Sequence, residues 1–68
     1  MTEYINKEYY KSLSVYDRAY IEPGININAF MDRLNAENIR FSATVSNYRR
    51  VVTVSKADEA RARAILDA

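Results

Sequence analysis

Cysteine, histidine and tryptophan are absent from this chain of 68 residues, which contains one glycine and one proline. Without cysteine, no disulfide or thiolate metal site can form. Without histidine, neither a Ser-His-Asp nor a Cys-His catalytic set can form. One glycine cannot build a phosphate-binding loop. We therefore expect a protein that is not an enzyme and that uses no metal and no cofactor.

Long apolar runs are absent as well. No stretch approaches the roughly 20 apolar residues of a membrane span. The first ten residues, MTEYINKEYY, contain no apolar run of signal-peptide length. These absences predict a cytoplasmic protein that does not associate with membranes.

The charges nearly balance. The chain has ten lysines and arginines and nine aspartates and glutamates, for a net charge of +1. Electrostatic attraction to nucleic acid through the overall charge is therefore not expected. The length predicts a single domain over residues 1–68. Chains below roughly 70–80 residues often need a disulfide, a metal or a partner subunit for stability. Without the first two, we expect either an oligomer or an unusually well-packed monomer.

Two segments have the periodicity of amphipathic helices. In the first, Asn26 or Asn28 can cap the start and Asn38 can end the helix, since Asn tolerates the left-handed conformation. The second starts at Ser55, with Asp58 three positions later as a variant of the capping box. The apolar stripes consist of Ile27, Phe30, Met31 and Leu34 in the first helix, and Ala62, Ile65 and Leu66 in the second.

Residues 39–45 and 49–55 alternate apolar and polar side chains, as half-buried strands do. Ser46, Asn47 and Tyr48 between them are too few for anything but a hairpin turn. Residues 1–22 fit two patterns. A helix would align Ile5, Tyr9, Leu13, Tyr16 and Tyr20, whereas a strand from Leu13 onward would point Leu13, Val15, Ala19 and Ile21 inward.

The resulting order is βαββα, with an additional N-terminal helix if residues 2–11 are helical. We expect an α+β fold with two helices on one face of a small antiparallel or mixed sheet. This resembles a ferredoxin-like domain that lacks its last strand. Exposed sheet edges invite pairing. The other sheet face should present Tyr16, Tyr20, Arg40, Arg49, Val51 and Thr53, which favours a dimer or a partner on that face. A tight hairpin should bring Arg40 close to Arg49.

The candidate binding residues are tyrosines and arginines. Six tyrosines are many for this length, and tyrosine is enriched at interface hot spots, although some can simply cap the core. Paired arginines at a hairpin can bind carboxylate or phosphate, although they can also keep a sheet edge soluble. The candidates are Tyr9, Tyr10, Tyr16, Arg40, Tyr48, Arg49 and Arg50.

Three segments carry a resemblance to a protein family. The run FMDRLNAENI, followed by FSATV and VTVSKADEARARAIL, resembles small accessory proteins of phages and conjugative elements of Firmicutes. The resemblance covers residues 9–66 and brings no catalytic motif. It implies an anti-defence protein, such as an anti-CRISPR, that works in the cytoplasm of the host bacterial cell. A looser likeness to ferredoxin-like signal-transducing domains fails where this chain has Glu37, Asn38 and Ile39.

Three functions follow as hypotheses. The first is a protein-interaction module that inhibits bacterial immunity by binding a bacterial protein, such as a CRISPR effector. The second is a nucleic-acid-binding domain that uses aromatic residues on the sheet. Near-neutral charge counts against this second hypothesis. The third is an oligomer, such as a homodimer, that senses or sequesters a nucleotide with arginines at the subunit seam.

Overall fold

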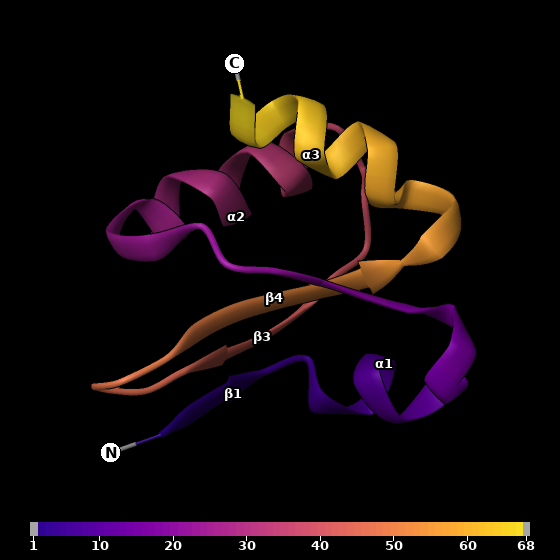
Figure 1. Ribbon diagram of the computed structural model, residues 1–68, viewed down its shortest axis with the longest axis horizontal. Helices are drawn as coiled ribbons and strands as arrows, with labels where there is room; N and C mark the ends of the chain where they lie inside the picture. The colour runs from indigo at the N-terminus through magenta and orange to yellow at the C-terminus, as the bar shows by residue number, and fades with distance from the viewer. Residues whose placement is uncertain (1, 68) are drawn as a thin grey trace.

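The protein is a small α+β domain with a four-stranded antiparallel sheet, related in arrangement to ferredoxin-like folds (Figure 1). The structure is a computed structural model and describes residues 2–67. Along the chain the elements are β1 (Glu3–Ile5), α1 (Lys7–Ser12), β2 (Arg18–Ile21), α2 (Ile27–Ala36), β3 (Ser42–Val45), β4 (Arg50–Ser55) and α3 (Glu59–Asp67).

The strand order is β1-β3-β4-β2, and each neighbouring pair is antiparallel. Strands β2 and β3 are therefore parallel to each other with β4 between them, as the predicted βαββα order requires. The free edge of β2 is where a ferredoxin-like fold would add its last strand. Strand β1, which the sequence did not predict, lies at the opposite edge.

The main core lies between the sheet and helices α2 and α3, which cover one face (Figure 1). The predicted inward residues of the C-terminal two-thirds are confirmed, because Leu34, Val52, Val54 and Ala62 have no exposed surface. Fully burying a valine or leucine side chain stabilises the fold by roughly 1.5–3 kcal/mol. Helix α2 ends at Ala36, and Asn38 adopts the left-handed conformation, with φ of 60°, as predicted.

Two predicted features near the N-terminus are wrong. The strand begins at Arg18 rather than at Leu13, because Val15–Asp17 form a 3-10 turn. Val15, predicted inward, is therefore 70% exposed. The turn is held locally, since the Ser14 hydroxyl donates to the Asp17 carboxylate over 2.9 Å. Local bonds of this kind compete with strand formation.

The same Ser-x-x-Asp spacing recurs before the last helix. The Ser55 hydroxyl donates to the Asp58 carboxylate over 3.1 Å, and Lys56–Asp58 form a 3-10 turn before α3. The predicted capping box is therefore modified, because the serine binds the side chain of Asp58 and not a backbone N–H group. Asn26 similarly lies at the N-cap position of α2 without a side-chain capping bond.

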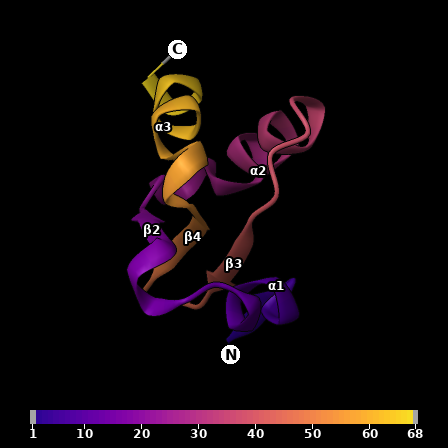
Figure 2. The same cartoon turned by 90° about the vertical axis from the view of Figure 1, so that its right-hand side faces the viewer.

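Helix α1 lies on the other side of the sheet from α2 and α3 (Figure 2). Two hydrogen bonds fix the segment that leads into it. The Asn6 amide donates to the carbonyl of Phe41 over 3.1 Å, and the Ser42 hydroxyl donates to the carbonyl of Ile5 over 3.1 Å. Asn6 itself has a positive φ of 58°. The extra N-terminal helix is thus present and partly covers the second sheet face.

Candidate functional site

The second face of the sheet carries a groove beside α1, which we call the outer groove. It has a volume of about 270 Å³. Alternation along β4 directs Val52 and Val54 into the core and Val51 and Thr53 to this second face. The groove is lined by Tyr4, Lys7, Tyr10, Lys11, Tyr20, Ser42, Thr44, Arg49, Val51 and Thr53.

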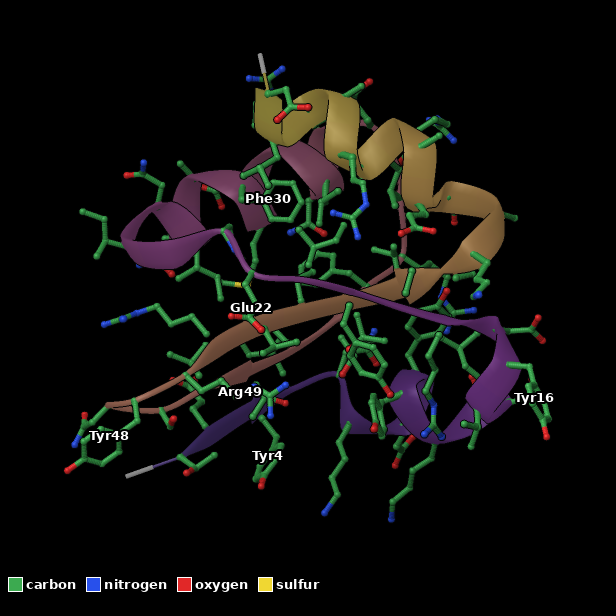
Figure 3. The ribbon with its side chains drawn as sticks, viewed as in Figure 1. Tyr4, Tyr16, Glu22, Phe30, Tyr48 and Arg49 are labelled. Carbon is green, nitrogen blue, oxygen red and sulfur yellow. The ribbon has the colours of Figure 1, made fainter. Side chains whose placement is uncertain are left out.

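The side chains at the floor of the outer groove are buried, whereas the tyrosines at its rim are exposed to solvent. Ser42, Val51 and Thr53 are each at most 5% exposed. Tyr4 on β1 and Tyr20 on β2 are 58% and 46% exposed. Because β1 and β2 are the two edge strands, these tyrosines flank the central strands from opposite sides. Figure 3 shows Tyr4 and Arg49 on the side of the sheet away from Phe30 in the main core.

Two tyrosine hydroxyls meet at one end of the groove. Tyr10 and Tyr20 share a hydrogen bond of 3.4 Å between their hydroxyl oxygens. This bond lowers the pKa of Tyr20, with partial desolvation opposing it and the nearby guanidiniums of Arg18 and Arg49 adding to the lowering. The same bond is the largest cause that raises the pKa of Tyr10.

Cations cover several of the aromatic rings. The Arg18 guanidinium lies 4.0 Å from the centre of the Tyr10 ring, and the Lys7 ammonium lies 5.3 Å from that of Tyr4. The Arg18 Nε atom is buried without a hydrogen-bond partner among the described residues. A cation placed over an aromatic face contributes roughly 0.5–1 kcal/mol at exposed sites, so these contacts help to hold the Tyr4 and Tyr10 rings in place.

Only two of the seven residues predicted as binding residues line the outer groove: Tyr10 and Arg49. Tyr9 is buried, at 8% exposure, and its ring lies 4.5 Å from the Arg40 guanidinium. Arg40 precedes β3, whereas Arg49 follows it in the hairpin, so the two lie at opposite ends of the ribbon. The expectation that they are close together is wrong.

The remaining three predicted residues lie elsewhere. Tyr16 is 86% exposed in the 3-10 turn before β2 and not on the outer strand face, which corrects its expected place. Tyr48 is 97% exposed at the tip of the hairpin (Figure 3). Arg50 pairs with Val45 and has the same strand parity as Val52, so it points to the face opposite that of Arg49. Arg49 and Arg50 therefore cannot bind one carboxylate or phosphate together.

Sequence reasoning missed Tyr4, Lys7 and Lys11 as parts of one surface. They reach the groove because β1 pairs with β3 and the chain then turns at Asn6 into α1. A three-residue strand has too little alternation to be recognised. Tyr20, by contrast, was predicted on the outer face, together with Val51 and Thr53, and this placement is confirmed.

Two further hollows lie outside the outer groove. One of about 420 Å³ is lined by Asn6, Asn35, Asn38, Arg40 and three apolar residues, and the Asn6 amide already binds the Phe41 carbonyl. Another lies between α2 and α3 around Phe30.

Within residues 2–67 no group of three potential ligands could hold a metal ion. No helix in this range is long and apolar enough to cross a bilayer.

The fold and the groove together define a small α+β domain with a concave, tyrosine-rimmed and cationic sheet face. No protein-family model, curated protein or solved structure matches the chain.

Proposed function

We propose that this protein is a non-enzymatic interaction module that binds a partner protein through the outer groove. The observation that carries the proposal is the pair of half-exposed tyrosines, Tyr4 and Tyr20, on either side of a closed floor. Tyrosine supplies a large contact area at low entropic cost. Interface hot spots are enriched in tyrosine and arginine and cluster in well-packed pockets.

The resemblance to accessory proteins of phages and conjugative elements gives this module a biological setting. In that setting the protein inhibits a bacterial defence protein, such as a CRISPR effector, by occluding a surface that the effector needs. The absence of histidine and cysteine supports inhibition by contact and not by chemistry. The bacterial cytoplasm is the compartment that this role requires.

The experiment compares three immobilised proteins as baits in a bacterial lysate. They are the wild type, the groove variant Tyr4→Ala/Tyr20→Ala, and the control variant Tyr16→Ala/Tyr48→Ala. The control removes two exposed tyrosines that do not line the groove. Circular dichroism establishes that all three are folded, and quantitative mass spectrometry measures each captured protein.

We expect one captured protein to be retained by the wild type and the control and to be lost from the groove variant. Truncating a hot-spot residue costs about 2 kcal/mol or more, which is roughly a 30-fold loss of affinity. Equal capture by the groove variant and the control would contradict the proposal. A captured defence protein would support the inhibitor role specifically.

A further inference from the structure

The outer groove has a one-sided charge. Lys7, Lys11 and Arg49 line it, and none of its ten lining residues is a carboxylate. Among residues 2–67, the ion pairs are Asp58–Arg61 and Glu59–Arg63 on the far side of the molecule, so the groove cations lack a carboxylate partner there. A chain of nearly balanced charge thus places three cations and no carboxylate in the lining of one surface.

We propose that the outer groove binds an acidic segment of a protein, with its carboxylates seated against Arg49, the two lysines and the Tyr20 hydroxyl. This inference rests on the proposed function and names the chemistry of its partner. Arginine and lysine form charge-assisted hydrogen bonds with carboxylates that are roughly twice as strong as neutral ones.

The hydroxyl pair strengthens the preference for an anion. Within the Tyr10–Tyr20 pair one hydroxyl donates to the other, which leaves one proton available for a ligand. Guanidinium and ammonium groups are donors only. Arg49, the two lysines and the free hydroxyl proton of the tyrosine pair therefore offer donors to an incoming oxygen, and a carboxylate accepts through both oxygens.

The ring faces distinguish an acidic peptide from a nucleic acid. Single-stranded nucleic acids bind by stacking bases on open aromatic faces. In this protein Arg18 lies over the Tyr10 ring and Lys7 lies near the Tyr4 ring. A stacking base would have to compete with these cations, whereas a carboxylate can bind the cations where they lie.

The size of the groove also favours side chains over a whole small molecule. Pockets that enclose drug-sized ligands occupy roughly 300–1,000 Å³. The outer groove, at about 270 Å³ and open to solvent, falls below that range. It has room for one or two acidic side chains of a segment that runs across the face.

The test measures binding of fluorescein-labelled probes by anisotropy at low ionic strength, where charge screening is weak. The probes are a decapeptide of alternating glutamate and glycine, its glutamine counterpart, and a decamer of deoxythymidine. The protein variants are Arg49→Gln and Lys7→Gln/Lys11→Gln. The matched controls are Arg33→Gln on α2 and Lys56→Gln before α3, which do not line the groove.

We expect the glutamate peptide to bind the wild type and both controls, and the glutamine peptide to bind at least tenfold more weakly. Arg49→Gln should weaken binding of the glutamate peptide at least about tenfold, because a charge-assisted hydrogen bond to the carboxylate is lost. Added salt should reduce the affinity further.

The inference is overturned if the glutamate peptide does not bind, if the groove variants bind it as the controls do, or if the oligonucleotide binds more tightly. Such a failure is separable from failure of the proposed function. A partner that is lost from Tyr4→Ala/Tyr20→Ala but retained by Arg49→Gln would preserve the interaction module and remove only its acidic specificity.

Discussion

Tyr9 and Tyr16 look alike in the sequence, yet the structure predicts opposite consequences for their replacement by alanine. Tyr9 is 8% exposed, whereas Tyr16 is 86% exposed. Truncating a buried aromatic side chain to alanine costs about 3–5 kcal/mol. Surface substitutions usually stay within about 0.5 kcal/mol. Tyr9→Ala should therefore be strongly destabilising and Tyr16→Ala nearly neutral.

Loss of the Tyr9 ring should also release helix α1 from the sheet. Helix α1 has six residues and contains one buried side chain, that of Tyr9. Isolated helices this short are not stable in water, so α1 depends on its contacts with β3. Without the Tyr9 ring, α1 should detach from the sheet, and the groove would then lose Lys7, Tyr10 and Lys11 together.

The assay is urea denaturation followed by far-ultraviolet circular dichroism. A single core in a chain of this size supplies only about 3–5 kcal/mol, so Tyr9→Ala should be largely unfolded at 25 °C without denaturant. Tyr9→Phe keeps the ring and should retain a midpoint close to that of the wild type. If Tyr9→Ala and Tyr16→Ala unfold at the same urea concentration, the assignment of Tyr9 to a structural role is refuted.

Three further predictions concern the groove and the turns. Tyr10→Phe should raise the pKa of Tyr20 toward its ordinary value of 10.0, and Tyr20→Phe should lower the pKa of Tyr10, because their shared hydrogen bond is the largest cause of both shifts; carbon-13 NMR of labelled tyrosine rings measures both, and unchanged pKa values would refute the pairing. Asn38→Ala should cost about 1 kcal/mol of unfolding free energy, since alanine lacks the short polar side chain that lets asparagine tolerate the left-handed conformation, whereas Asn38→Gly should cost less; equal melting temperatures for the two variants would contradict this. Ser46→Ala should cost roughly 1 kcal/mol, because the Ser46 hydroxyl accepts hydrogen bonds from the backbone N–H groups of Tyr48 and Arg49; a hairpin that keeps its amide-exchange protection after this change would count against that role.

Much of the fold was predictable because its signals are local. The stripe of Ile27, Phe30 and Leu34 has the helical period and only one face of α2 can be buried. Alternation in β3 and β4 predicted which side chains enter the core, and a loop of Ser46–Arg49 joins them as a hairpin. The α+β class and the position of α2 and α3 on one face follow from these patterns.

The candidate site was less predictable because it is assembled from segments distant in sequence. Tyr10 and Arg49 were identified as contact residues, but neither Tyr4 nor the two lysines of α1 carries a local signal. The seven candidates also included Tyr9, which residue type alone could not separate from the exposed tyrosines. Whether a tyrosine lies on a rim or under a helix depends on what packs above it.

The sequence by itself determined the class of fold, the inward faces of its main helices and strands, and the lack of histidine and cysteine chemistry. These depend on residue type and on periods of two and 3.6, which act over a few residues. Only the tertiary structure decided that β1 joins the sheet at β3, that α1 crosses to the second face, and that Lys7, Lys11 and Arg49 meet there without a carboxylate. Pairing between segments distant in the sequence sets those neighbours, and the spacing of residues along the chain does not indicate which segments pair.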